Sequence, residues 1–286
     1  MNYTITKNQY ESLKLHDLNF EKTADKYLTK EEITAIGFQE TLYLTAEEGG
    51  SYANFSSFAY WENRNIKQAF YEARENLKVL QSWNLLQEEN GQLRAGYVLL
   101  GVNAGAKGMG IKGIETFEHF EMFQLRSLKD NDNYKRIPNA MRYKNALIKT
   151  GNEKFYNEVV SGTYMTDFIK GFPTNYGPDI PKKIKEIGRE LNYTEDQSET
   201  FYTNVCKLFG EILVNELALL GGQTHTLVVM GKNKETNVVN EFLRRSGLDE
   251  QYKVTNISHY SGSPTHIELA NEIIQAFQQV RHSKSS

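Results

Sequence analysis

The chain has 286 residues, of which 39% are hydrophobic and 12% aromatic, and its formal net charge is −3 at pH 7. This length suits one large domain, or a core domain with an extension. The single cysteine, Cys206, excludes a disulfide framework, a cysteine-ligated zinc site and an iron–sulfur cluster within one chain. The first residues lack the apolar core of a secretory signal, and no stretch has the composition of a transmembrane span. We therefore expect a cytoplasmic protein with no membrane partner.

Residues 1–92 are predicted to form a mainly helical N-terminal extension. Apolar residues recur at steps of three and four between Ile66 and Trp83, which predicts a long amphipathic helix. Asn90-Gly91 then predicts a turn into the first strand. We therefore divide the chain into this extension, 1–92, and an α/β/α domain over 93–286.

Strands and helices are predicted to alternate after residue 93. Apolar runs predict strands at 96–102, 162–167, 225–231 and 252–258. Periodic patterns predict helices near 139–150 and at 196–220, 236–246 and 264–280. Gly221-Gly222 is typical of a helix end, and Thr265 with Glu268 has the spacing of a capping box. Such alternation predicts an α/β fold, a three-layer α/β/α sandwich with a short central parallel sheet covered on both faces.

Hydrogen-bonding side chains follow two of these strands. Asn103 lies just past the first strand, and His259 directly follows the last. In open parallel sheets, ligands bind at the carboxyl ends of the strands. We therefore expect the four strand ends to meet at one crevice that holds the functional site.

The glycine-rich segment after the first strand does not match a phosphate-binding P-loop. Lys107 follows Ala106, and no hydroxyl residue follows the lysine as the P-loop requires. Gly108, Gly110 and Gly113 satisfy the bare dinucleotide pattern, but they begin too far beyond the strand to form its tight turn. A nucleotide-cofactor enzyme stays one alternative, and we expect neither a cofactor nor a metal.

Three strand-end motifs together resemble those of the uracil-DNA glycosylase superfamily. Gly101-Val-Asn-Ala-Gly105 resembles the Gly-x-Asn-Pro-Gly signature of the mismatch-specific branch. His259-Tyr-Ser-Gly-Ser-Pro264 resembles the His-Pro-Ser-Pro signature near the C-terminus of the family. The segment 162–170 is similar to the middle strand that ends on a base-reading side chain. Alanine and tyrosine, Ala104 and Tyr260, stand where the two signatures have proline.

The resemblance covers about residues 93–280 and implies a uracil-DNA glycosylase-like fold and a monofunctional DNA glycosylase. The aspartate-containing water-activating loop of the uracil-specific branch is absent, as are the cysteines of the iron–sulfur branches. In this interpretation Asn103 positions a water, His259 stabilises the departing base, and Asp167 recognises that base. A turn-capping asparagine, a histidine that bonds loop carbonyls and an aspartate in a salt bridge are the structural alternatives.

Asp167 carries the prediction of the substrate. The corresponding family position often holds asparagine, whereas a carboxylate accepts hydrogen bonds and would pair with the exocyclic amine of cytosine. The small residues of 106–110 stand where uracil-specific relatives carry a bulky tyrosine, which leaves room for a substituent at the 5-position of the ring. Because removal of plain cytosine would destroy the host genome, we expect a modified cytosine. Such a base, for example glucosylated hydroxymethylcytosine, occurs in phage DNA. An enzyme that removes it would be a bacterial antiviral enzyme.

The remaining predicted contacts are with the base and with DNA phosphates. Base contacts are predicted for Gly101, Phe117, Phe120 and Tyr164. Phosphate contacts are predicted for Lys107, Lys232, Ser261, Gly262 and Ser263. Core packing and helix capping would explain many of the same residues. DNA is the expected partner, and no obligatory protein partner is inferred. Repair of uracil or a mismatched base, and a nucleic-acid-binding protein without catalysis, are the alternative functions.

Overall fold

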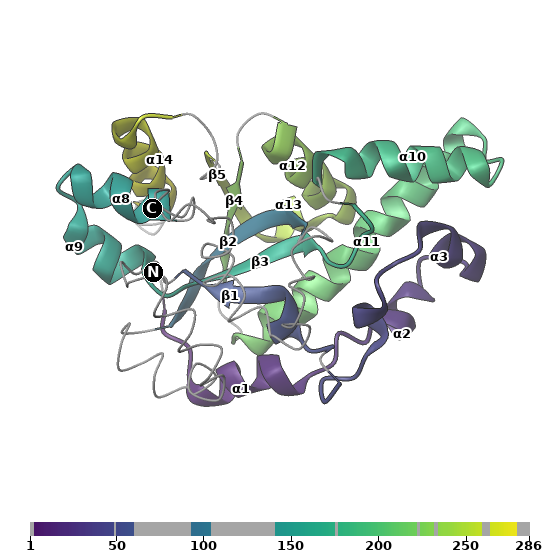
Figure 1. The fold of residues 1–286 in the computed structure, drawn as a ribbon, viewed down its shortest axis with the longest axis horizontal. Coiled ribbons are helices and arrows are strands. Elements are labelled where there is room, and N and C mark those ends of the chain that lie inside the picture. The colour runs from purple at the N-terminus through teal and green to yellow at the C-terminus, as the bar shows by residue number, and fades with distance from the viewer. Residues whose placement is uncertain are drawn as a thin grey trace, which may run out of the picture.

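A mostly parallel sheet forms the centre of the computed structural model, which describes residues 3–48, 50–59, 93–103, 141–174, 177–221, 224–231, 234–258 and 264–278 (Figure 1). The described strands are ordered β1-β3-β2-β4-β5 across the sheet. They are β1 Ser56–Phe58, β2 Arg94–Asn103, β3 Thr163–Ile169, β4 Thr226–Met230 and β5 Lys253–Ile257. Strands β3, β2, β4 and β5 run parallel, and β1 pairs antiparallel to β3. The predicted α/β class and its four parallel strands are confirmed. The three-residue strand β1 was not predicted.

Helices cover both faces of the sheet, which buries the apolar strands from both sides. On one face Leu99 and Val228 join a core with α8 (Met141–Lys149) and α14 (His266–Gln278). On the other face Leu100 and Val229 join a core with α11 (Glu195–Leu219) and α12 (Lys234–Ser246). Figure 1 shows the two helical layers on opposite sides of the strands. This arrangement is compatible with the predicted three layers.

The predicted helices over 139–150, 196–220, 236–246 and 264–280 correspond to α8, α11, α12 and α14. The chain also forms helices that were not predicted: α9 Glu153–Phe155, α10 Ile180–Glu190 and α13 Leu248–Gln251. Tyr156–Val160 is a π-helix, and Glu40–Tyr43, Tyr52–Phe55 and Gly177–Asp179 are 3-10 helices. Within the described ranges, no helix combines the length and the apolar character needed to cross a bilayer.

Two of the helix ends follow the predicted chemistry. The Thr265 N–H donates to the Glu268 carboxylate at 2.8 Å, and the Glu268 N–H donates back to the Thr265 hydroxyl at 3.2 Å. These reciprocal bonds satisfy backbone donors at the start of α14. Gly221 follows α11 with φ of +108°, a conformation that glycine adopts without steric cost. The predicted capping box and the predicted end of α11 are therefore confirmed.

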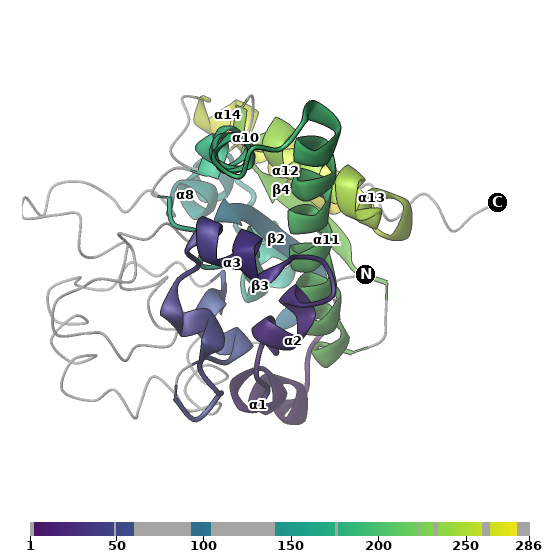
Figure 2. The same cartoon turned by 90° about the vertical axis from the view of Figure 1, so that its right-hand side faces the viewer.

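The N-terminal segment packs directly on the α/β layers. Its helices are α1 Lys7–Leu15, α2 Phe20–Ala24 and α3 Lys30–Ile36, and the first two contact α11 (Figure 2). Tyr10 and Phe20 lie in the same buried cluster as Val98 of β2. The hydroxyl of Tyr27 donates to Glu211 of α11 at 2.8 Å. The described residues before and after position 92 thus share one hydrophobic core. The helix predicted at 66–83 lies outside the described residues.

Candidate active site at the ends of the parallel strands

The carboxyl ends of four parallel strands lie at one edge of the sheet, as the sequence predicts. Asn103 at the end of β2 is level with Ile169 of β3, and Met230 of β4 is level with Ile257 of β5. Neighbouring strands are about 4.8 Å apart, so the whole row spans roughly 15 Å. The candidate site is therefore the edge formed by these strand ends.

Asp167 and Gly101 are in register on neighbouring strands, and their side-chain positions touch. A Cβ atom placed on Gly101 would lie only 2.1 Å from Oδ1 of Asp167 and 3.8 Å from the methyl group of Met230. The carboxylate therefore lies over the glycine backbone, in space that any side chain at position 101 would fill. Asp167 is half-buried. The structure thus brings together two of the predicted base-binding residues and adds Met230, the last residue of a buried strand, which the sequence analysis missed.

The chain that leads into His259 is held by both neighbouring helices. The Ser258 N–H donates to Oε2 of Glu272 on α14 at 2.8 Å. The carbonyl oxygen of Ser258 accepts a bond of 2.7 Å from the hydroxyl of Tyr143 on α8. Both backbone groups of the residue directly before His259 are thereby fixed. Neither helix residue was predicted for the site, because only the fold shows that α8 and α14 meet at the end of β5.

The chain that follows the 259–263 segment is also held. Nη2 of Arg142 on α8 donates to the carbonyl oxygen of Pro264 at 3.1 Å. About two turns further along α8, Lys149 Nζ lies 3.3 Å from Nε2 of His266. Partial burial, together with the charges of Lys149 and Arg142, lowers the pKa of His266 below its ordinary value. Ser258 and Pro264, the described residues on either side of 259–263, are therefore both hydrogen-bonded to α8.

Tyr164 is placed differently from the prediction. Its side chain is fully buried and faces the α11 side of the sheet, in the cluster that contains Phe168. The hydroxyl donates to Oε1 of Glu216 at 2.7 Å, and the ring packs edge-on against Phe58 at 5.4 Å. Burial, with the Glu216 charge beside it, holds the pKa of Tyr164 well above its usual value. The ring has no exposed surface on which a base could stack, which corrects its predicted role to a structural one.

A buried ion pair lies behind the end of β3. Lys170 Nζ is 2.8 Å from Oε2 of Glu216 on α11, and both side chains are fully buried. The same ammonium donates to the backbone carbonyl of Asp167 at 2.7 Å. This pair was not predicted from the sequence, because charged residues are normally exposed. One signal was present: Glu216 falls on the apolar face of α11, between Leu213 and Leu217.

Several predicted site residues cannot be placed in this geometry. The backbone of Asn103 is described as the last residue of β2, but its side chain is not. The other predicted contacts that lie outside the described residues are Lys107, Phe117, Phe120, Lys232, His259, Ser261, Gly262 and Ser263. Among the residues that the structure does describe, no group of three or more His, Cys, Asp or Glu side chains could hold a metal ion.

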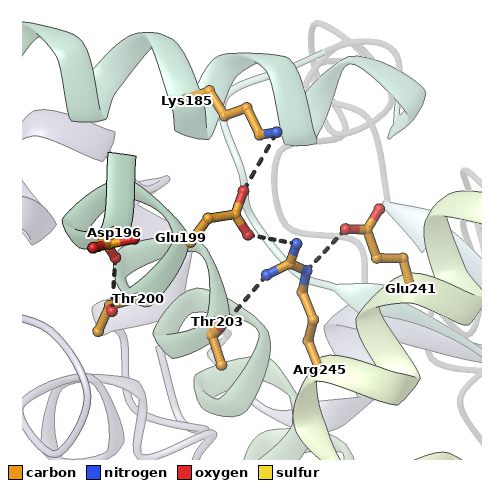
Figure 3. Close-up of polar contacts among 7 residues, drawn as sticks. All are labelled: Lys185, Asp196, Glu199, Thr200, Thr203, Glu241 and Arg245. Atoms are coloured by element: carbon orange, nitrogen blue, oxygen red, sulfur yellow. Dashed lines mark hydrogen bonds and ion pairs between the residues drawn. The ribbon is translucent and has the colours of Figure 1, made fainter. Parts of the chain in front are cut away.

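A second polar cluster, centred on Arg245 of α12, is a structural brace (Figure 3). Its guanidinium donates to Glu199 and to Glu241, both at 2.8 Å, and to the hydroxyl of Thr203 at 3.1 Å. It also lies 4.1 Å from the ring centre of Tyr202. Hydrogen bonding from Arg245 lowers the pKa of Glu199. These contacts join α12 to α11, and the guanidinium makes its hydrogen bonds to residues of these two helices.

No protein-family model, curated protein or solved structure matches the chain. The likeness to the uracil-DNA glycosylase superfamily therefore depends on the strand-end motifs and stays a prediction.

Proposed function

We propose that this protein is a DNA glycosylase that hydrolyses the N-glycosidic bond of a modified cytosine flipped out of DNA. The observation that carries the proposal is the Asp167 carboxylate, which lies against Gly101 at the edge where the parallel strands end. The strands that lead into the Asn103 and His259 motifs, β2 and β5, end at the same edge. Removal of phage DNA bases such as glucosylated hydroxymethylcytosine would be the biological role.

The strand register supports a shared site for the two motifs. Leu100 of β2 is level with Val229 of β4, which is level with Asn256 of β5. In the sequence, Asn103 comes three residues after Leu100, and His259 comes three residues after Asn256. Two strand spacings amount to about 10 Å, a separation that a base and its sugar can bridge.

The proposed chemistry divides the work between the two motifs. The base must first leave the stack, because the duplex hides the glycosidic bond. As an amide, Asn103 is no strong base, so it would orient a water towards the sugar carbon. His259 would donate a hydrogen bond to the base carbonyl on which negative charge develops as the bond breaks. His259 directly follows Ser258, whose carbonyl oxygen and N–H are hydrogen-bonded to Tyr143 and Glu272.

Asp167 would supply the base recognition. An ionised carboxylate only accepts hydrogen bonds, so it suits the exocyclic amine of cytosine and repels the carbonyl oxygen that uracil has there. Its half-buried position limits competition from water. The requirement for a modification rests on the sequence of 106–110, where no bulky aromatic residue stands to exclude a substituent at the 5-position of the ring.

A substrate panel tests the proposal directly. Purified protein is incubated with DNA that contains glucosylated hydroxymethylcytosine, plain cytosine or uracil, and abasic sites are then cleaved with alkali. We expect strand breaks with the modified cytosine, and their loss in the Asn103→Ala variant with an unchanged circular dichroism spectrum. Breaks only with uracil would support repair instead. DNA binding without release of any base would support a binding protein that lacks catalysis.

A further inference from the structure

We infer that Lys170 is a positioning residue, which fixes the end of β3 from behind and so holds the Asp167 carboxylate in place. The inference rests on the proposed function for the role of Asp167 in reading the base. Lys170 directly follows β3, and its ammonium contacts the Asp167 carbonyl and the Glu216 carboxylate at 2.7 and 2.8 Å. The Asp167 side chain lies on the opposite face of the sheet, over Gly101.

The ion pair belongs to a chain of contacts that starts and ends on β3. The Tyr164 hydroxyl donates to one oxygen of Glu216, the other oxygen pairs with Lys170, and Lys170 returns to the Asp167 carbonyl. Glu216 is the only member of this chain that comes from a different element, α11. The contacts therefore fix the C-terminal end of β3 relative to α11, the longest helix of the described fold.

Stability alone is a weak reason for this pair. Two charges lose their hydration when they are fully buried, and apolar residues of similar size often serve stability equally well. What a paired ammonium adds is direction, because its donors are aimed at particular acceptors. Here the hydrogen-bond acceptor is the carbonyl oxygen of Asp167, the proposed base-reading residue, whereas Oε2 of Glu216 pairs with the ammonium by charge.

The end of β3 is paired on one side only among the described strands, because β2 continues beside Asp167 and Ile169 whereas β1 does not. Strand β1, the described neighbour on that side, pairs with β3 only as far as Thr166. Gly171 then turns the chain with φ of +62°, and its carbonyl accepts from the Gln39 N–H at 3.0 Å. Lys170 acts in the interval between these two supports. A rotation of the Asp167 peptide there would move the carboxylate, and a displacement of about 1 Å can cost on the order of 100-fold in rate.

The first test measures base selectivity in Lys170→Met/Glu216→Gln. This variant removes both charges together, and the glutamine oxygen still accepts from Tyr164. The readout is the ratio of single-turnover release rates for glucosylated hydroxymethylcytosine and uracil. This ratio does not depend on how much of the protein is active, so a purely structural loss leaves it constant. We expect the ratio to fall by about tenfold.

Arg245→Met is the matched control, because it removes the charge and the hydrogen bonds of another cluster. The hydrogen bonds of that cluster join α12 to α11. Its ratio should equal that of the wild type. An unchanged ratio in the double variant, or an equal fall in the control, would overturn the positioning role.

A second readout needs no activity. With ¹³C-labelled aspartate, the carboxyl resonance of Asp167 is identified by its loss in Asp167→Asn. We expect this resonance to shift in the double variant and to keep its position in Arg245→Met. A resonance that stays in place in the double variant refutes the inference. If the wild type releases no base, the proposed function fails, and the resonance still decides the role of Lys170.

A conservative variant covers a failure of the double variant to fold. Lys170→Arg keeps the pairing charge but replaces the compact ammonium by a longer, planar group. The same shift of the Asp167 resonance is expected, and a wild-type position of that resonance contradicts the inference.

Discussion

Gly101 and Asp167 depend on each other because both occupy the same small space at the edge of the sheet. The carboxylate can lie flat over β2 only where the residue beneath it has no side chain. Glycine at position 101 is thus explained by close approach rather than by an unusual backbone angle. Two predictions follow from this close approach.

Replacing the carboxylate of Asp167 by an amide should change which base is preferred. Asp167→Asn adds an N–H donor that suits the carbonyl oxygen of uracil, and a matched contact of this kind is worth about 1–3 kcal/mol of discrimination. We expect the release-rate ratio to shift towards uracil by about tenfold or more. Asp25→Asn, at an exposed position after α2, is the control. Equal ratios in wild type and Asp167→Asn would remove base reading from this residue.

Adding a methyl group at position 101 should push the carboxylate away. Gly101→Ala should lower the free energy of unfolding by about 1–3 kcal/mol, the usual cost of overpacking. In an Asp167→Ala background the same change should cost much less, because the clashing oxygen is gone. Urea denaturation of the four proteins in this double-mutant cycle gives the coupling energy. A coupling energy near zero would contradict the close contact.

At the scale of elements, helices α8 and α14 hold the chain on both sides of the 259–263 segment. Tyr143 and Glu272 bind Ser258, and Arg142 binds Pro264. These contacts are directed at backbone groups, so they hold Ser258 and Pro264 independently of the side chains at those two positions. A motif that carries an imidazole benefits from such fixed ends, since orientation limits the rate of a reaction between held groups.

Removal of the Tyr143 hydroxyl should slow base release more than it lowers stability. Tyr143→Phe leaves the buried Ser258 carbonyl without this donor, at a cost of about 1–3 kcal/mol. Tyr27→Phe is the matched control, because it removes a hydroxyl that bonds Glu211 at a similar distance on the N-terminal side. Single-turnover rates and thermal midpoints are compared for both. If the two variants lose activity in the same proportion as stability, the Tyr143 bond has no special effect on the site.

At the scale of the whole molecule, the N-terminal segment, β2 and β4 meet at His225. Its Nδ1 lies 2.8 Å from the Ala95 carbonyl and 3.0 Å from the Tyr3 hydroxyl, and its Nε2 lies 3.2 Å from the Leu217 carbonyl. The imidazole is 3% exposed. Burial lowers the pKa of His225 below its ordinary value, because the charged form loses hydration.

Stability should therefore decline as the pH falls through the range where free histidine titrates. The unfolded chain takes up the proton near pH 6.5, whereas the folded chain takes it up only at lower pH, so protons favour unfolding in that interval. The contribution is complete above about pH 6.5 and is lost below it. Glu199 and Glu211 have lowered pKa values and act in the same direction, but below about pH 4.5.

Urea denaturation between pH 5 and pH 7.5 checks this expectation. The slope of the unfolding free energy should be smaller in His225→Gln than in the wild type. His266→Gln, at a more exposed histidine, should change the slope less. Identical slopes in wild type and His225→Gln would contradict the neutral, buried state of His225.

The sequence by itself determined the four parallel strands, the helices α8, α11, α12 and α14, and the cap of α14. These features depend on local information, because apolar periodicity and helix-capping residues involve positions that are close together in the sequence. Only the tertiary structure decided that β1 joins β3, that Tyr164 is buried, and that Lys170 pairs with Glu216. Residues such as tyrosine and lysine are usually at least partly exposed, and their burial depends on what packs against them from distant parts of the chain. From the sequence alone, Lys170 and Glu216 would be taken for two surface charges. Both are buried because α11 packs across the sheet and excludes water from them.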